Sequence, residues 1–123
     1  MPALPPALPR TQMPPAVGTT VAYIHAHLDE RLPLDELAHR AGLSVWRFAT
    51  VFRRHTGASP RRYICALRVQ RAQRLLDRGE AVATAAAQAG FYDQSHLSRH
   101  FKQLCGMTPG QYLALQRQAL QAA

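Results

Sequence analysis

The sequence predicts an all-α protein of about seven helices, arranged as two homeodomain-like helix-turn-helix subdomains joined by a long linker helix. From Thr20 onward, apolar residues recur three or four positions apart, and no run alternates apolar and polar residues as a strand does. Glycine and proline divide this pattern into short segments. A segment from the middle of the chain also recurs near its end. These three observations carry the fold prediction.

Start and stop signals bound each expected helix. Thr19 or Thr20 is expected to cap the first helix, and Gly42 to close the second in a left-handed conformation. Ser44 and Asp93 are expected to cap the third and sixth helices. The helices are predicted over residues 19–30, 34–41, 45–55, 60–77, 81–89, 94–105 and 109–118.

The same punctuation predicts the organisation of the chain. Prolines crowd the amino-terminal residues, where no periodic apolar pattern is found, so we expect a disordered leader or linker there. The predicted fourth helix has apolar residues on two sides, which suits packing on two small cores. The predicted parts are a leader over 1–16, a first helix-turn-helix subdomain over 17–57, a linker helix over 58–79, a second subdomain over 80–118 and a tail over 119–123.

The charge balance points to a polyanionic partner. Fifteen Lys+Arg against seven Asp+Glu give a formal net charge of +8, with a sequence pI near 10.8. Lys102 is the single lysine, and the other basic residues are arginines, whose planar fork suits phosphates and guanine edges. An arginine bias of a GC-rich genome is the alternative explanation, and charge alone does not decide between the two.

Localisation is predicted from what the chain lacks. Residues 1–9 have neither the basic flank nor the apolar stretch of a secretory signal, and no apolar run could span a bilayer. Cys65 and Cys105 lie far apart with no CxxC spacing, so we expect free thiols in packing roles. A cytoplasmic, nucleoid-associated protein without membrane contact is therefore expected.

An internal duplication is the strongest signal. Residues 52–63 read FRRHTGASPRRY and residues 101–112 read FKQLCGMTPGQY, and both fit Phe-x4-Gly-x2-Pro-x2-Tyr. Upstream, an Ala-x3-Gly pair at residues 38 and 42 recurs at residues 86 and 90, so the second copy holds one extra residue between its turn glycine and its next helix. Two copies with the same spacing of phenylalanine, glycine, proline and tyrosine are hard to explain by chance.

Each copy has what a helix-turn-helix needs. Ala38 and Ala86 are small enough for two helices to cross closely, and a glycine supplies each turn. An apolar residue after the glycine closes the corner, and apolar residues then recur on the inward face of the second helix. These are Leu43, Phe48, Val51 and Phe52 in the first copy, and Phe91, Leu97 and Phe101 in the second.

Three segments carry a resemblance to a known family: AGFYDQSHLSRHFKQLCGMTPGQY (89–112), LDELAHRAGLSVWRFATVFRRHTGASPRRYI (34–64) and RVQRAQRLL (68–76). They are similar, in this order, to the signature, the first unit and the linker helix of the DNA-binding domain of AraC/XylS bacterial transcription regulators. The resemblance covers residues 20–117. The resemblance implies an activator or repressor of promoters that works with a separate sensor domain. Thr50, where the family often has a basic residue, departs from the pattern, as do Thr56, His100 and Cys105.

Outward residues of the two second helices are the predicted base readers. Gln suits the adenine edge and Arg the guanine edge, whereas Trp46 suits thymine methyls or sugars unless it rests on the preceding helix. The predicted base-reading residues are Val45, Trp46, Arg47, Thr50, Gln94, Ser95, His96 and Arg99. Phosphate contacts are predicted for Arg53, Arg54, Arg61, Arg62 and Lys102, with backbone amides near Ser59 and Thr108.

An enzyme, a cofactor and a metal site are not expected. His96 and His100 have the spacing of a metal-binding pair, but no third ligand accompanies them and no HExxH motif is present. No catalytic triad or glycine-rich phosphate loop fits the helical pattern. We expect no small-molecule site in this chain.

Double-stranded promoter DNA is the predicted partner, bound by a monomer that fills an asymmetric site, with RNA polymerase as a second partner. Two alternatives remain open. A nonspecific nucleic-acid-coating protein would use the same charge with little sequence preference. A polymerase-binding module would keep its activity without the base-reading residues. Arg71, Arg74 and Arg78 form a basic stripe that could face DNA, solvent or polymerase.

Overall fold

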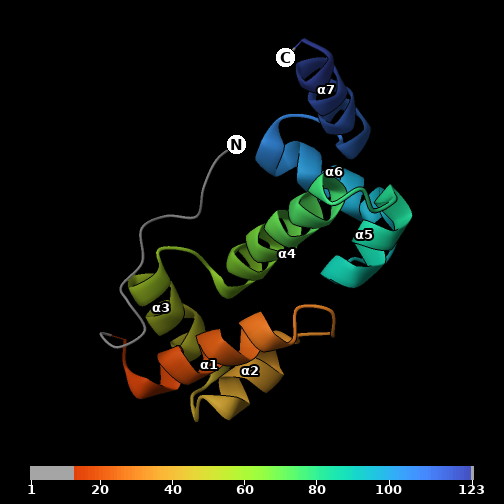
Figure 1. The fold of residues 1–123 in the computed structure, drawn as a ribbon. Coiled ribbons are helices and arrows are strands. Elements are labelled where there is room, and N and C mark those ends of the chain that lie inside the picture. Colours follow the sequence, from red (N-terminus) through yellow and green to blue (C-terminus); the bar gives the residue numbers. More distant parts are fainter. Residues whose placement is uncertain (1–12, 123) are drawn as a thin grey trace. The chain divides into compact units, whose positions relative to one another are not determined.

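The computed structural model describes residues 13–122, and the helical fold class is confirmed in that part of the chain (Figure 1). No strand is found among the described residues. The helices are α1 (Pro15–Ala26), α2 (Leu34–Arg40), α3 (Val45–Thr56), α4 (Pro60–Asp77), α5 (Val82–Ala89), α6 (Gln94–Cys105) and α7 (Pro109–Ala122).

The described chain divides into two compact units, which we call the first unit (residues 13–67) and the second unit (residues 68–122). The division falls within α4, so each unit contains part of that helix. Each unit also has its own hydrophobic core. The apolar residues of α4 sort accordingly: Tyr63, Ile64 and Leu67 join the first core, and Val69, Ala72 and Leu76 join the second.

In the first unit, α1, α2 and α3 pack against one another. Val17 and Ile24 of α1 are fully buried together with Phe48 and Phe52 of α3. The two phenylalanine rings lie 5.5 Å apart between centroids, and Tyr63 meets Phe52 edge-on at 5.3 Å. Burial of these side chains is the main term that holds three short helices together, because such helices are marginal alone.

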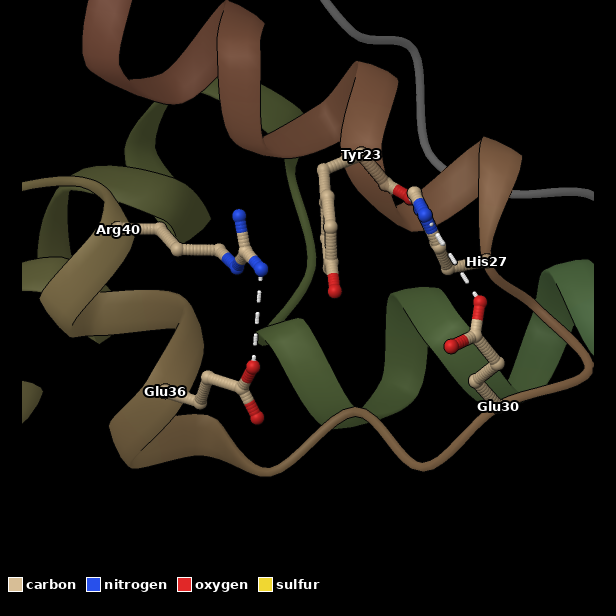
Figure 2. Close-up of polar contacts among 5 residues, drawn as sticks. All are labelled: Tyr23, His27, Glu30, Glu36 and Arg40. Carbon is tan, nitrogen blue, oxygen red and sulfur yellow. Dashed lines mark hydrogen bonds and ion pairs between the residues drawn. The ribbon is translucent and has the colours of Figure 1, made fainter.

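A surface stack also ties α1 to α2 (Figure 2). The Tyr23 ring lies between the Arg40 guanidinium, 3.9 Å from its centroid, and the His27 ring, stacked at 4.0 Å. Glu36 forms an ion pair with Arg40 at 3.8 Å, and Glu30 lies 3.8 Å from His27 Nε2, a contact that is an ion pair only when the ring is protonated. Both contacts are largely exposed and contribute little, so the stacked rings carry most of the contact between the two helices.

In the second unit, α5 and α6 form a closely packed pair and α7 packs on α6. Three alanines of α5 are buried against Leu97 and Phe101 of α6. Small side chains on α5 let the two helices approach closely, as the repeat predicted for Ala86. The first turn of α7 is linked to the end of α4 through Tyr112, whose hydroxyl donates to Asp77 Oδ1 at 2.6 Å.

The predicted limits of the first helix were wrong at both ends. The helix begins at Pro15, not at residue 19, because proline suits the first helical position and the Gly18 amide bonds the Pro14 carbonyl at 3.0 Å. Met13 and Val17 are buried in the core, which stabilises this added turn. The end of the predicted leader, residues 13–16, is therefore part of the folded unit; its remainder, residues 1–12, lies outside the described residues.

The helix also ends at Ala26, not at residue 30, because the side chain of His27 takes a helical hydrogen bond. His27 Nδ1 donates to the Tyr23 carbonyl at 2.8 Å, while the His27 amide turns to the Ile24 carbonyl at 3.2 Å. Neither Thr19 nor Thr20 caps the helix: the Thr20 hydroxyl is buried and donates to the Ala16 carbonyl. At the other end of the chain, α7 runs four residues beyond the predicted 118, to Ala122.

Candidate nucleic-acid interface

The two turns between paired helices have the same hydrogen bonds. In the first unit, the Leu43 amide donates to the Ala38 carbonyl at 3.0 Å; in the second, the Phe91 amide donates to the Ala86 carbonyl at 2.9 Å. Gly42 and Gly90 have φ of 71° and 93°, a left-handed conformation that side chains with a Cβ disfavour. The duplicated segments therefore form the same kind of turn, in which the apolar residue after the glycine packs at the corner between the two helices.

The caps after the two turns were also predicted correctly. The Arg47 amide donates to Ser44 Oγ at 3.1 Å, and the His96 amide donates to Asp93 Oδ1 at 2.7 Å. Each bond satisfies an amide that has no partner in the first turn of the helix. α3 and α6 therefore start at defined residues, which fixes the register of every outward side chain that follows.

On α3, the predicted base-reading residues all face outward. Val45, Trp46, Arg47 and Thr50 are exposed, whereas Phe48 and Phe52 are fully buried. Trp46 is 73% exposed, which argues against the alternative that its ring rests on the preceding helix. The Thr50 hydroxyl donates to the Trp46 carbonyl at 2.9 Å, so at rest it is occupied within its own helix.

On α6, three of the four predicted residues, Gln94, Ser95 and Arg99, are exposed. His96 differs from them because its ring is half-buried and already occupied. Its Nδ1 accepts the Tyr92 amide at 3.1 Å, and the ring packs edge-on against Phe91 at 5.2 Å. An Nδ1 that accepts a hydrogen bond leaves the ring proton on Nε2, so His96 can offer a partner only that donor.

The predicted phosphate-binding residues are exposed as well: Arg53, Arg54, Arg61, Arg62 and Lys102. Some of the backbone amides near Ser59 and Thr108 make hydrogen bonds within the chain. The Arg62 amide donates to Ser59 Oγ at 3.3 Å. Thr108 and Gln111 form a reciprocal capping box at 2.9 and 3.2 Å. The Arg62, Thr108 and Gln111 amides are therefore hydrogen-bonded within the chain, and phosphate contacts by backbone amides near these helix starts stay a prediction.

Sequence reasoning missed Tyr92. The residue lies between Phe91, which closes the turn, and Asp93, which caps α6, and its side chain is 92% exposed. It lines a shallow, open depression with Asp93, Ser95, His96 and Arg99. The one-residue insertion in the second copy of the repeat was the available signal, since the insertion falls at this turn.

The described residues contain no candidate metal site. No group of three His, Cys, Asp or Glu side chains there could hold a metal ion, and the paired His96 and His100 rings contact each other at 4.8 Å. Burial raises the pKa of the Cys105 thiol, which disfavours the reactive thiolate. No helix in the described part of the chain is both long and apolar enough to cross a membrane.

Two helix pairs whose turns make the same hydrogen bond, each presenting an exposed, basic second helix, define a helix-turn-helix DNA-binding domain. A family described as "Helix-turn-helix domain" matches residues 37–115. An uncharacterized HTH-type transcriptional regulator of Bacillus subtilis, YobQ, is 38% identical over 99 residues, which are 76% of this chain and 39% of YobQ.

Solved structures agree with this class. The DNA-binding domain of AdpA, a global transcriptional factor crystallised with a target DNA, matches with a TM-score of 0.80 and 33% identity, covering 85% of this chain and 95% of that one. An AraC-type regulator of Chromobacterium violaceum matches with a TM-score of 0.72 and 26% identity, covering 81% and 90%. The chain therefore belongs to the AraC-type helix-turn-helix family. This family and fold are those of sequence-specific DNA-binding transcription regulators and not of enzymes.

Proposed function

We propose that the chain binds promoter DNA as a two-unit reader, with α3 and α6 placed in adjacent major grooves. The observation that carries this proposal is the repeated turn and cap, which present an exposed second helix twice. The likeness to the AdpA domain, whose solved structure contains a target DNA, supports the same partner. Adjacent major-groove faces are about 34 Å apart, so two half-sites about one helical turn apart are expected.

Base reading is assigned to the exposed residues of the two helices. Arg47 and Arg99 are the strongest candidates, because a guanidinium can bond guanine O6 and N7 together. Gln94 suits adenine, and Trp46 suits a thymine methyl. Val45, Thr50 and Ser95 complete the surface, and His96 contributes through its Nε2 donor.

Phosphate contacts are assigned to the exposed cations that flank these helices, namely Arg53, Arg54, Arg61, Arg62 and Lys102. They supply affinity that depends on salt and carries no sequence information. Because the two second helices carry different side chains, the bound site is asymmetric and one monomer fills it. RNA polymerase is the proposed second partner, and the cytoplasm, at the nucleoid, is the proposed location.

Selection of bound duplexes from a randomised DNA pool at physiological salt tests the proposal. Two short motifs about one helical turn apart are expected for the wild-type chain. The matched control carries Arg47→Ala, Gln94→Ala and Arg99→Ala, and should lose the enrichment while it retains salt-sensitive binding. Tight binding of the wild type without any enriched motif would indicate a nonspecific coating protein. Full activity in the triple variant would indicate a polymerase-binding module instead.

A further inference from the structure

The turn before α6 holds a residue that the turn before α3 lacks. In the first unit, Leu43 closes the turn and Ser44 caps the helix directly. In the second unit, Tyr92 stands between Phe91, which closes the turn, and Asp93, which caps the helix. The turns are otherwise alike, so the inserted residue is what the second unit has added to the shared scaffold.

The inserted side chain is displayed on a backbone that is held in place. The side chain of Tyr92 is 92% exposed, while that of the preceding Phe91 is 6% exposed. The Tyr92 amide donates to His96 Nδ1 at 3.1 Å, and the His96 ring packs against both Phe91 and His100, at centroid distances of 5.2 and 4.8 Å. A contact made from a fixed backbone position loses less entropy on binding than one made from a loose loop.

Tyr92 also belongs to the surface that carries the second set of base readers. It lines the same shallow depression as Ser95 and Arg99. The neighbouring Asp93 carboxylate would repel a phosphate, but its Oδ1 accepts the His96 amide at 2.7 Å, and the depression also contains the Arg99 guanidinium. The chain as a whole has a net charge of +8, which favours a polyanion over a neutral protein as its partner.

We propose that Tyr92 contacts the DNA backbone at the rim of the groove that α6 enters, a role that rests on the function proposed above. Its phenol hydroxyl donates to a phosphate oxygen and its ring lies against the adjoining deoxyribose. The first turn of a recognition helix meets the base edges, so a residue that precedes this turn lies beside the phosphates. Tyrosine hydroxyls are among the side-chain groups that make such contacts. Besides the Nε2 contact proposed above, His96 also acts as a positioning residue, because its Nδ1 accepts the Tyr92 amide.

Fluorescence anisotropy with two labelled duplexes tests this contact. One duplex carries the selected site and the other a scrambled site, and each is titrated at several salt concentrations. Tyr92→Phe removes only the hydroxyl and should weaken binding about threefold to tenfold, equally on both duplexes. Tyr92→Ala also removes the ring and should lose more. The slope of log Kd against log salt should not change, since tyrosine is neutral.

Leu120→Ala is the matched control, because Leu120 is a large side chain of the same unit that is 78% exposed. It should bind both duplexes as the wild type does, and thermal unfolding followed by circular dichroism should show all three variants folded. His96→Asn retains an acceptor near the Tyr92 amide and should bind better than His96→Leu, which has none. That rescue should disappear when Tyr92 is alanine, a coupling that a merely structural role of His96 would not produce.

Three results would overturn the proposal. If the Tyr92 variants bind both duplexes as tightly as the wild type does, the backbone contact does not exist. A loss confined to one base pair of the selected site would make Tyr92 a base reader. If the Tyr92 variants keep their DNA binding but lose transcription activation, the Tyr92 ring contacts a protein and not DNA. If the wild type itself fails to distinguish the two duplexes, the proposed function fails, and the Tyr92 contact is still decided by the loss on the scrambled duplex.

Discussion

The two units share the residues that pack and differ in the residues that face outward. Phe52 meets Tyr63 at 5.3 Å in the first unit, and Phe101 meets Tyr112 at 5.5 Å in the second, so the duplicated Phe–Tyr pair makes the same contact twice. The starts of the second helices differ in chemistry: α3 begins with Val45 and Trp46, and α6 with Gln94 and Ser95. Packing constrains a duplicated scaffold, while its exposed face is free to acquire a different specificity.

The tyrosine hydroxyls show where that constraint ends. Tyr63 lies 3.1 Å from His25 Nε2, and Tyr112 donates to Asp77 Oδ1 at 2.6 Å. Gln116 also donates to Asp77 Oδ1, at 2.5 Å, and to the Tyr112 hydroxyl at 2.9 Å. The two units share the ring positions because their cores are close-packed. Each hydroxyl lies at the edge of its core, and its hydrogen-bond partner therefore depends on the side chain that the neighbouring helix places there.

The largest expected effect tests whether each core supports its own unit. Phe52→Ala should destabilise the protein by about 3–5 kcal/mol, because it removes a fully buried ring and leaves a cavity. Hydrogen exchange should rise in α1, α2 and α3 more than in α5 and α6, and Phe101→Ala should produce the reverse pattern. Uniform exchange throughout the chain in both variants would contradict separate stabilisation of the two units.

Arg99→Ala should show the next largest effect, on DNA binding by the second unit. Loss of a bidentate contact to guanine should cost about 1–3 kcal/mol and relax specificity at one position of the site. Competition between the selected duplex and its single-position variants measures this. Equal weakening on every duplex, together with a reduced salt slope, would assign Arg99 to a phosphate instead. Arg117→Ala, at an exposed arginine of α7, is the control.

Trp46→Ala tests the apolar character proposed for the first unit. A thymine methyl that packs on the exposed indole should be worth about 0.8 kcal/mol, the value of one buried carbon group. Replacing each thymine of the first half-site by deoxyuridine should therefore weaken wild-type binding at one position. The Trp46→Ala chain should not respond to that replacement. A variant that still discriminates thymine from deoxyuridine would show that another side chain makes the contact.

An effect of similar size to that of Trp46→Ala is expected for the hydroxyl of Tyr112. Burial, followed by the Asp77 carboxylate, raises the pKa of Tyr112 above its ordinary value. The neutral phenol is thus favoured in the folded protein, so its stabilising contribution is complete below about pH 10, the pKa in the unfolded chain, and is lost as pH rises through the folded-state pKa.

Tyr112→Phe should therefore cost about 0.5–1.5 kcal/mol near neutral pH, the usual net value of one hydrogen bond. Urea unfolding between pH 8 and pH 11 should show a smaller decline for the variant than for the wild type. The two stability curves should approach each other at the alkaline end. Parallel curves over the whole range would mean that Tyr112 does not titrate differently in the two states.

Much of the fold was predictable from local chemistry. The turn at Gly42, the caps at Ser44 and Asp93, and the starts of α4 and α7 at prolines all depend on residues within a few positions of each other. The outward exposure of Trp46 and Arg99 followed from the same register, because a fixed helix start and a buried inner face determine which residues face solvent. Their roles on DNA remain proposals.

What the sequence by itself determined is the repeated helix-turn-helix, its turns, its caps and the two faces of each second helix, since each is set by interactions between near neighbours. Only the tertiary structure decided the features that depend on contacts across the chain or on competition for one hydrogen bond. The first helix starts before the predicted residue because Met13 and Val17 are buried in the core of the first unit. It ends before the predicted residue because the His27 ring hydrogen-bonds the Tyr23 carbonyl. The hydrogen bond from the Tyr92 amide to the His96 ring is another such feature, because the sequence pattern does not predict which ring will bond which backbone group.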